Sequence, residues 1–459
     1  MPSNIIDKLF TSKKTLTRDV FFTATTSGIT LIFSIVFFSL LGHQLPVDQF
    51  GVMGLALTAS NLLSLLPTYG FDLFIIRELV QEKYNIQDVF WSIVCVKFLL
   101  SILTLFLLYS YAMASAAVTD VYSFMLFGVA AILLSFTAFL NSVNKAAEHF
   151  YVETAVTILQ SLTQVLGILV IAYWTDLGVA HVAWVVVFSR LLGLLMSIKF
   201  FLQLSPAPNL PGMTYLSPTL SQMWKMVEQA FPFAVHSIAG ALYFQIDTLL
   251  VAEMATPASI GYYQASMRLI TPLMALPILL ISAFFPRVAS EFADELRVAQ
   301  NGRTGHMLMH ILGISGVLIT MFMGIGAPVI ITLVYGVKMS PAIPILQVLS
   351  LVVLVRFVAS GYGLILISSG RQSVQAVSAV IALFINIALN VFLIPCFDAI
   401  GAAFTSVITN LVILTIYFVV ICVTLRETFW GGMSQSFGVI YSQIAGVVKA
   451  YCVQHRRQD

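Results

Sequence analysis

The residues of this chain best able to do chemistry are charged side chains inside long apolar runs. Arg356 and Arg190 fall near the middle of two runs, Lys97 lies nearer one end of a third, and Arg268 lies just inside the end of a fourth. A charge at mid-membrane depth costs a few kcal/mol, so each one needs a partner or a wet cavity. Because arginine offers fixed planar donors to phosphate oxygens, the set predicts a cavity that binds an anion such as a phosphate or diphosphate.

Acidic residues are rarer than basic ones in the apolar runs. Asp247 and Glu253 lie toward one end of a single run, so the buried cations outnumber the buried anions. Asp247 is the strongest candidate for coupling transport to an ion. A structural interpretation stays open beside this one: Arg268 pairs with Asp247, while Lys97 and Arg190 extend their charges toward the membrane surface.

Other residue types give little support for catalysis or cofactor binding. His306 and His310 have the i, i+4 spacing of a two-histidine metal site, but no acid of the HExxH type lies between them, so a structural or interfacial role is favoured. No GxSxG, P-loop or paired-carboxylate motif occurs. We therefore expect no catalytic residue, no metal and no cofactor. Packing is the role expected for four scattered cysteines: Cys95, Cys396, Cys422 and Cys452.

The elements that must position the charged residues are membrane-spanning helices. With 59% hydrophobic residues, 9% charged residues and a mean hydropathy of +0.97, the chain is too poor in charge for a soluble surface. Apolar runs as long as a hydrocarbon core predict about 12 helices in an all-α integral membrane protein. Their expected ranges are 20–41, 50–69, 89–111, 121–141, 154–173, 179–202, 227–251, 267–286, 307–334, 343–367, 374–394 and 401–425.

The distribution of basic residues predicts the orientation of these helices. Of the 22 Lys and Arg residues, 17 fall at the two termini, in the even-numbered gaps or, for Lys199, at the adjoining end of the span 179–202, and only Lys338 falls in an odd-numbered gap. Because cationic loops are retained in the cytoplasm, both termini are expected to be cytoplasmic.

Reporter fusions test this orientation. Fusions at Lys83, Gln300 and Arg456 should report the cytoplasm, and fusions at Ala116 and Asp176 should report the exterior, because the basic gaps stay inside. A consistent inversion would reject the predicted orientation.

The chain is predicted to consist of two six-helix bundles, at residues 1–203 and 227–425. A proline-containing cytoplasmic linker at 204–226 separates them, and a cytoplasmic tail with an interfacial amphipathic helix follows at 426–459. A short turn whose glycine opens the next helix recurs in both halves, at Gly51 and at Gly261. With six spans each, the halves are parallel repeats, and a transporter of this kind holds its cargo between its bundles.

Several segments, in order along most of the chain, resemble the polysaccharide-transport branch of the multidrug/oligosaccharidyl-lipid/polysaccharide exporter superfamily, which includes O-antigen repeat-unit flippases. The matching segments are Phe50–Gly51, Tyr69–Asp72, Ile76–Leu79, Ile246–Thr248, Ile260–Leu269, Phe285–Val288, Tyr335–Gly336, Ile343–Leu346, Asn390–Pro395 and Gly401–Ala403.

The resemblance implies a non-enzymatic flippase in a bacterial plasma (inner) membrane. Its expected cargo is an undecaprenyl-diphosphate-linked saccharide used to build O-antigen lipopolysaccharide or a related surface polysaccharide. The expected partners are membrane lipids, a coupling ion (H+ or Na+) and a polysaccharide polymerase, with no nucleic acid. Arg268 falls where lipid II flippases of the superfamily have an arginine facing the cavity. The first span lacks the cationic residues of those flippases, which argues against a peptidoglycan precursor as cargo.

Two alternatives stay open. A cation-coupled multidrug exporter of the same superfamily would more naturally use buried carboxylates, for which Asp247 is the one strong candidate. A membrane-embedded polymerase or acyltransferase would be expected to show a large outer loop or a catalytic His/Asp pair, and neither is evident in the sequence.

Overall fold

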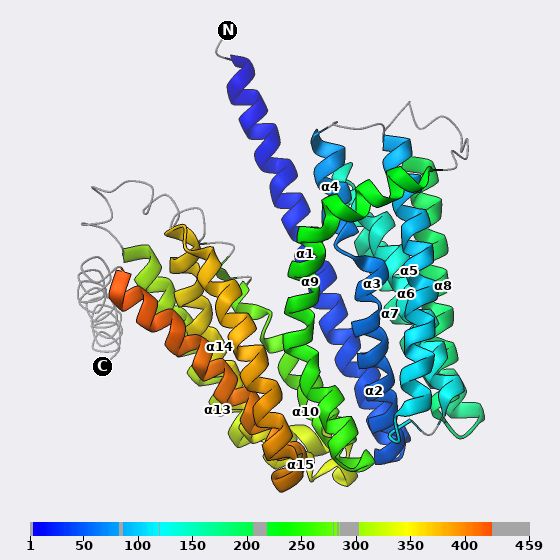
Figure 1. Cartoon of the computed structure of the whole chain (residues 1–459), viewed down its shortest axis with the longest axis vertical. Helices are drawn as coiled ribbons and strands as arrows, with labels where there is room; N and C mark the ends of the chain where they lie inside the picture. Colours follow the sequence, from blue (N-terminus) through cyan, green and yellow to red (C-terminus); the bar gives the residue numbers. More distant parts are fainter. Residues whose placement is uncertain are drawn as a thin grey trace, which may run out of the picture. The chain divides into compact units, whose positions relative to one another are not determined.

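The computed structural model describes residues 3–81, 86–118, 120–204, 218–278, 280–281, 284 and 303–424. Regular structure in these ranges is helical throughout (Figure 1). Most of the predicted linker at 204–226 and the whole predicted tail helix at 426–459 lie outside the described residues, so both stay predictions.

The first part of the chain forms a series of helices, because apolar runs in lipid must satisfy their backbone hydrogen bonds internally. These helices are α1 (Ser3–Gln44), α2 (Val47–Leu63), α3 (Leu65–Thr68), α4 (Phe71–Gln81), α5 (Ile86–Ala114), α6 (Val121–Ala146), α7 (Phe150–Trp174), α8 (Val179–Leu204), α9 (Leu220–Met254) and α10 (Pro257–Leu273). The remaining elements are α13 (Arg303–Tyr335), the short 3-10 helix η1 (Val337–Met339), α14 (Ala342–Ser368) and α15 (Gln372–Thr424).

Within the described ranges, nine helical segments are long and apolar enough to cross a membrane. One of them, α15, is 53 residues long and breaks at Asp398, where φ is 55°, so it supplies two crossings, as the sequence predicts for 374–394 and 401–425. Helix α9 covers the predicted seventh span at 227–251, whereas α10 begins at Pro257, ten residues before the predicted start of the eighth span at 267. The predicted all-α, multi-span membrane fold is confirmed.

Contacts divide the chain into two compact units. Unit 1 consists of Met1–Ala265 and Ile331–Pro341, and unit 2 consists of Ser266–Ile330 and Ala342–Asp459. In unit 1, α6 packs on α5 and α8, α7 packs on α1 and α8, and α9 packs on α2 and α5 (Figure 1). In unit 2, α14 packs along α15. Unit 1 thus contains α9, which follows the predicted linker.

The second predicted span is one crossing made of three helices. Helix α2 ends at Leu63, the short α3 follows, and the chain then passes through Tyr69 and Gly70, both with positive φ (42° and 68°), into α4. A Cβ on Gly70 would lie 2.5 Å from the Cβ of Phe233 in α9, so the close approach of α9 and the left-handed backbone both require glycine here. The break starts α4 in a new direction and places Asp72 in its first turn.

Candidate functional site

Arg190 lies between two helices of unit 1 and is held by an amide. From α8, its Nη1 donates a hydrogen bond of 2.8 Å to Oε1 of Gln160 in α7. Beside this pair, Nε2 of Gln164 donates to Oγ of Ser189 at 3.0 Å. The side chain of Arg190 is half-buried. A neutral amide orients the guanidinium without cancelling its charge, so the charge stays available to an anion.

In unit 2, Arg356 has a similar amide contact. Its Nη1 lies 3.4 Å from Oδ1 of Asn410, which joins α14 to α15. The charge of Arg356 also acts on the phenol of Tyr417 in α15. The side chain is half-buried, as is that of Arg268 in α10. The structure therefore gives both arginines partial access, and their role toward a substrate stays a prediction.

Lys97 differs from these arginines because packing encloses it completely. Its side chain is 0% exposed, and its Nζ donates to Oγ of Ser135 at 2.9 Å. The ammonium lies 5.6 Å and 5.4 Å from the ring centroids of Phe136 and Phe139 in α6. Asp72 in α4 interacts with it electrostatically. A substrate could meet Lys97 only after these side chains move apart.

We expect Lys97 and Asp72 to stabilise unit 1 as a pair. Lys97→Met removes the charge at similar volume and leaves Asp72 with only the weaker electrostatic interaction of Lys145, so the cost in the free energy of unfolding should approach the roughly 3–5 kcal/mol of a broken buried pair. Adding Asp72→Asn should recover most of that loss, because the double variant buries no unpaired charge. Thermal unfolding in detergent measures both effects.

Additive losses in the two single variants would contradict this pairing. The double variant also tests the predicted substrate contact of Lys97. If it folds and still transports, the ammonium does not bind the cargo.

Asp247 lies in a buried polar cluster of unit 1 that joins α9, α10 and α2. Tyr263 donates to Oδ2 of Asp247 at 3.3 Å. Nε2 of Gln264 lies 3.1 Å from Oγ1 of Thr58 and 3.3 Å from Oγ1 of Thr248. We did not predict a role for Gln264 or Thr58. A signal was available, because Asp247 and Gln264 both lie in segments that carry the family resemblance.

The two glycines that open corresponding helices lie against each other in unit 1. A Cβ on Gly51 in α2 would lie 2.5 Å from the carbonyl oxygen of Pro257, and a Cβ on Gly261 in α10 would lie 2.6 Å from the carbonyl oxygen of Val47. Any larger residue at either position would push the helices apart. The recurring turns of the two predicted halves therefore meet in direct backbone contact, at the end of the spans predicted to be outer.

Lys338 links η1 to the end of α1 at the same end of unit 1. Its Nζ donates to the carbonyl oxygens of His43 at 2.9 Å and of Leu45 at 2.6 Å. These carbonyls lie at the C-terminus of α1, where backbone acceptors lack helical partners and the helix dipole favours a cation. Partial burial lowers the pKa of the Lys338 ammonium. The one basic residue in an odd-numbered gap thus has a local structural role.

A third contact joins the ends of α5 and α9. Oε1 of Glu253 accepts hydrogen bonds from the hydroxyls of Tyr111 at 2.8 Å and Ser115 at 2.7 Å. Glu253 is therefore engaged at the predicted outer end and is not part of the cluster around Asp247.

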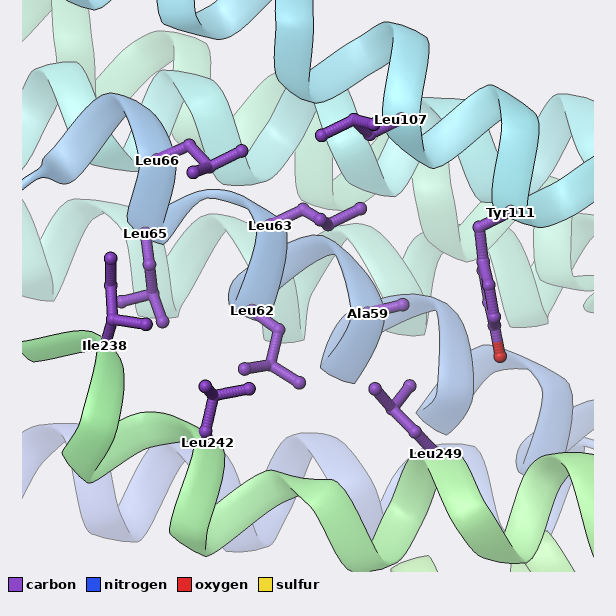
Figure 2. A pocket seen from close by; sticks show the side chains of 10 residues that line it. All are labelled: Ala59, Leu62, Leu63, Leu65, Leu66, Leu107, Tyr111, Ile238, Leu242 and Leu249. Atoms are coloured by element: carbon purple, nitrogen blue, oxygen red, sulfur yellow. The ribbon is translucent and has the colours of Figure 1, made fainter. Parts of the chain in front are cut away.

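An apolar slot of about 500 Å³ lies within unit 1, and Tyr111 is one of the residues that line it. Figure 2 shows side chains from α2, α3, α5 and α9 that point toward one another across it, with Tyr111 at one end beside Leu249. Seven of its ten lining residues are leucines. The slot is not evident from the sequence, because its lining residues belong to four helices whose mutual packing is not encoded in any single apolar run.

The described residues contain no cluster of three or more His, Cys, Asp or Glu side chains able to hold a metal ion. His310 lies in α13.

A family model described as "Polysaccharide biosynthesis protein" matches residues 16–292. No curated protein sequence matches the chain. Among solved structures, a lipid II flippase MurJ in an inward closed conformation has a TM-score of 0.72 at 13% identity, covering 92% of this chain and 93% of that one.

Two multidrug resistance MATE family transporters of the MOP superfamily also match. An inward-facing structure has a TM-score of 0.64 at 13% identity, covering 88% of this chain and 94% of that one. An outward-facing structure has a TM-score of 0.55 at 13% identity, covering 89% and 95%. At these identities the likeness shows a shared transporter fold.

Proposed function

Because the chain belongs to the polysaccharide biosynthesis protein family, we propose that it is a flippase for undecaprenyl-diphosphate-linked oligosaccharide repeat units. It would move these units, destined for O-antigen lipopolysaccharide or a related surface polysaccharide, from the inner to the outer leaflet of a bacterial plasma membrane. The transporter fold shared with a lipid II flippase supports this class of cargo.

The observation that carries the proposal is the amide-held Arg190 near the middle of α8. A cation at this depth is costly unless it pairs with something, and Gln160 supplies an acceptor without supplying charge. A diphosphate supplies the charge and matches the planar donors of a guanidinium. Arg356, Arg268 and Lys97 are proposed to add positive charge along the path of the head group.

Alternating access explains how the saccharide crosses. Moving a hydroxylated saccharide through hydrocarbon unaided would leave many hydrogen-bonding groups unsatisfied, at several kcal/mol each. A wet cavity between two six-helix bundles removes most of that cost, while the prenyl tail stays in an apolar environment. The contacts of Gly51 with Gly261 and of Lys338 with α1 are candidates for the contacts that must break when the outer end opens.

Asp247 is the proposed coupling residue for H+ or Na+. It is 5% exposed, and Tyr263 donates a hydrogen bond to it. A buried carboxylate that binds a cation would change its hydrogen bonding to Tyr263 and, through α10, the position of Gln264 in the same cluster.

The test is to identify the lipid-linked saccharide that accumulates on the cytoplasmic face when the protein is absent. Accumulation of a diphosphate-linked repeat unit, reversed by restoring the protein, supports the proposal. Unchanged lipid-linked saccharides together with loss of drug efflux would reject it in favour of a cation-coupled multidrug exporter. Conversion of the saccharide by purified protein would instead indicate a polymerase or acyltransferase.

A further inference from the structure

We propose that the apolar slot of unit 1 binds the prenyl chain of the lipid-linked cargo, an inference that rests on the proposed function. The slot follows α9 from Ile238 to Leu249, a distance of about 16 Å at the helical rise. This length is about half of a hydrocarbon core. The slot is therefore elongated along the membrane normal, as a site for a chain would be.

The lining offers a polar ligand almost no partner. The one polar side chain among the lining residues is Tyr111, and its hydroxyl already donates to Glu253, which leaves only the phenol oxygen as an acceptor. A phosphate, or a saccharide with many hydroxyls, would therefore lose most of its bonds to water without replacement. A hydrocarbon chain has no such groups, so it is the ligand class that the lining accepts.

Access to the slot is from the lipid. Leu107 lines the slot and is 36% exposed, and on the same helix Leu103 and Phe106 are 44% and 64% exposed. These side chains form a continuous apolar surface on α5 that leads to the slot. In a membrane this surface is bordered by hydrocarbon, so a chain can enter without crossing water.

The prenyl chain fits this slot better than a phospholipid acyl chain does. Burial in leucine gives an acyl chain no hydrophobic gain over the bilayer, because lipid tails are as apolar as leucine. A methyl-branched prenyl chain packs less closely among straight acyl chains, and it can gain dispersion contacts against branched leucine side chains. The carboxylate of Glu253 would repel a diphosphate, so the slot takes the chain and not the head group.

Photolabelling of the full-length protein tests the assignment. The probe is undecaprenyl phosphate with a diazirine on its chain, added to protein in vesicles of phosphatidylglycerol and phosphatidylethanolamine. Labels are expected in peptides covering 59–66 and 238–249. Excess unlabelled undecaprenyl phosphate should remove them, and equal amounts of extra phosphatidylglycerol should not. Equal competition by phosphatidylglycerol, or labelling spread evenly over α5, would overturn the proposal.

Two leucines on α5 provide a matched pair of variants. Leu107→Trp should narrow the slot and reduce this labelling on the order of tenfold, while Leu99→Trp, two turns away on α5 and outside the surface that leads to the slot, should leave it unchanged. Ala59→Leu fills the slot from α2 and should have the same effect as Leu107→Trp. Equal labelling in a folded Leu107→Trp or Ala59→Leu variant would reject the site.

This assay separates the inference from the proposed function, because the probe carries no saccharide and requires no transport. Transport of the saccharide without labelling of the slot would overturn the inference and leave the function intact. Labelling of the slot without any change in lipid-linked saccharides on deletion would support a prenyl site and reject the flippase.

Discussion

Replacing Arg190 with glutamine is expected to reduce transport of the lipid-linked saccharide roughly 10- to 100-fold, because hydrogen bonds to a charged group contribute about 1.5–3 kcal/mol. Glutamine keeps a donor for Gln160 and removes the charge, so the variant should insert and unfold like the natural protein. Arg190→Lys should recover only part of the activity, since lysine lacks the planar fork. Flipping of the saccharide in proteoliposomes, normalised to protein amount, measures the effect.

The control for charge loss lies on the same helix. Lys199 in α8 is exposed, and Lys199→Gln should transport normally, which separates loss of the Arg190 charge from loss of any cation on α8. Arg356→Ala and Arg268→Ala are expected to behave like Arg190→Gln, with partial rescue by lysine. Normal transport in a correctly folded Arg190→Gln variant would show that the charge of Arg190 does not bind the diphosphate, and would reject the proposed anion-binding role.

Hydropathy and turn residues predict most of the crossings, because in lipid a helix is the simplest way for an apolar segment to satisfy its polar backbone groups. The break between the last two predicted spans shows this well. The apolar run from 374 to 425 is interrupted by a short polar and proline-containing segment, and the structure places the helix break at Asp398 within it. The bends inside the second span were not predicted, since Tyr69 adopts a positive φ that its residue type does not favour.

The environments of the charged residues could not be predicted in the same way. Lys97 and Arg190 look alike in sequence, as single cations within apolar spans. The structure encloses Lys97 between the rings of Phe136 and Phe139 and leaves Arg190 half-buried beside an amide. The difference arises from which helix faces meet, and hydropathy reports only that a face is apolar. For the same reason, the sequence showed that Lys338 is the one basic residue in an odd-numbered gap, but it did not show that Lys338 contacts the end of α1.

The recurrence of Gly51 and Gly261 gives the clearest link between sequence and mechanism. Matching turns in two parallel halves indicate a repeat, but repetition alone does not require the turns to touch. The structure brings them together so closely that neither position has room for a side chain. Because Val47 and Pro257 supply the carbonyls at this contact, the proposed alternating-access mechanism predicts that the two turns separate here when the outer end opens.

Crosslinking this contact is therefore expected to stop transport almost completely and reversibly. Cysteines introduced at Val47 and Pro257, in a background without the four natural cysteines, should form a disulfide that holds α2 against α10 and blocks opening of the outer end. Reduction should restore transport, because the bond changes no residue in the cavity. The two single-cysteine variants, treated with the same oxidant, control for the substitutions.

Loss of transport in the crosslinked protein requires that α2 and α10 separate once per transport cycle. If the disulfide forms in nearly every molecule and transport still proceeds at the full rate, the outer end opens elsewhere, and the contact of Gly51 with Gly261 is a fixed part of unit 1.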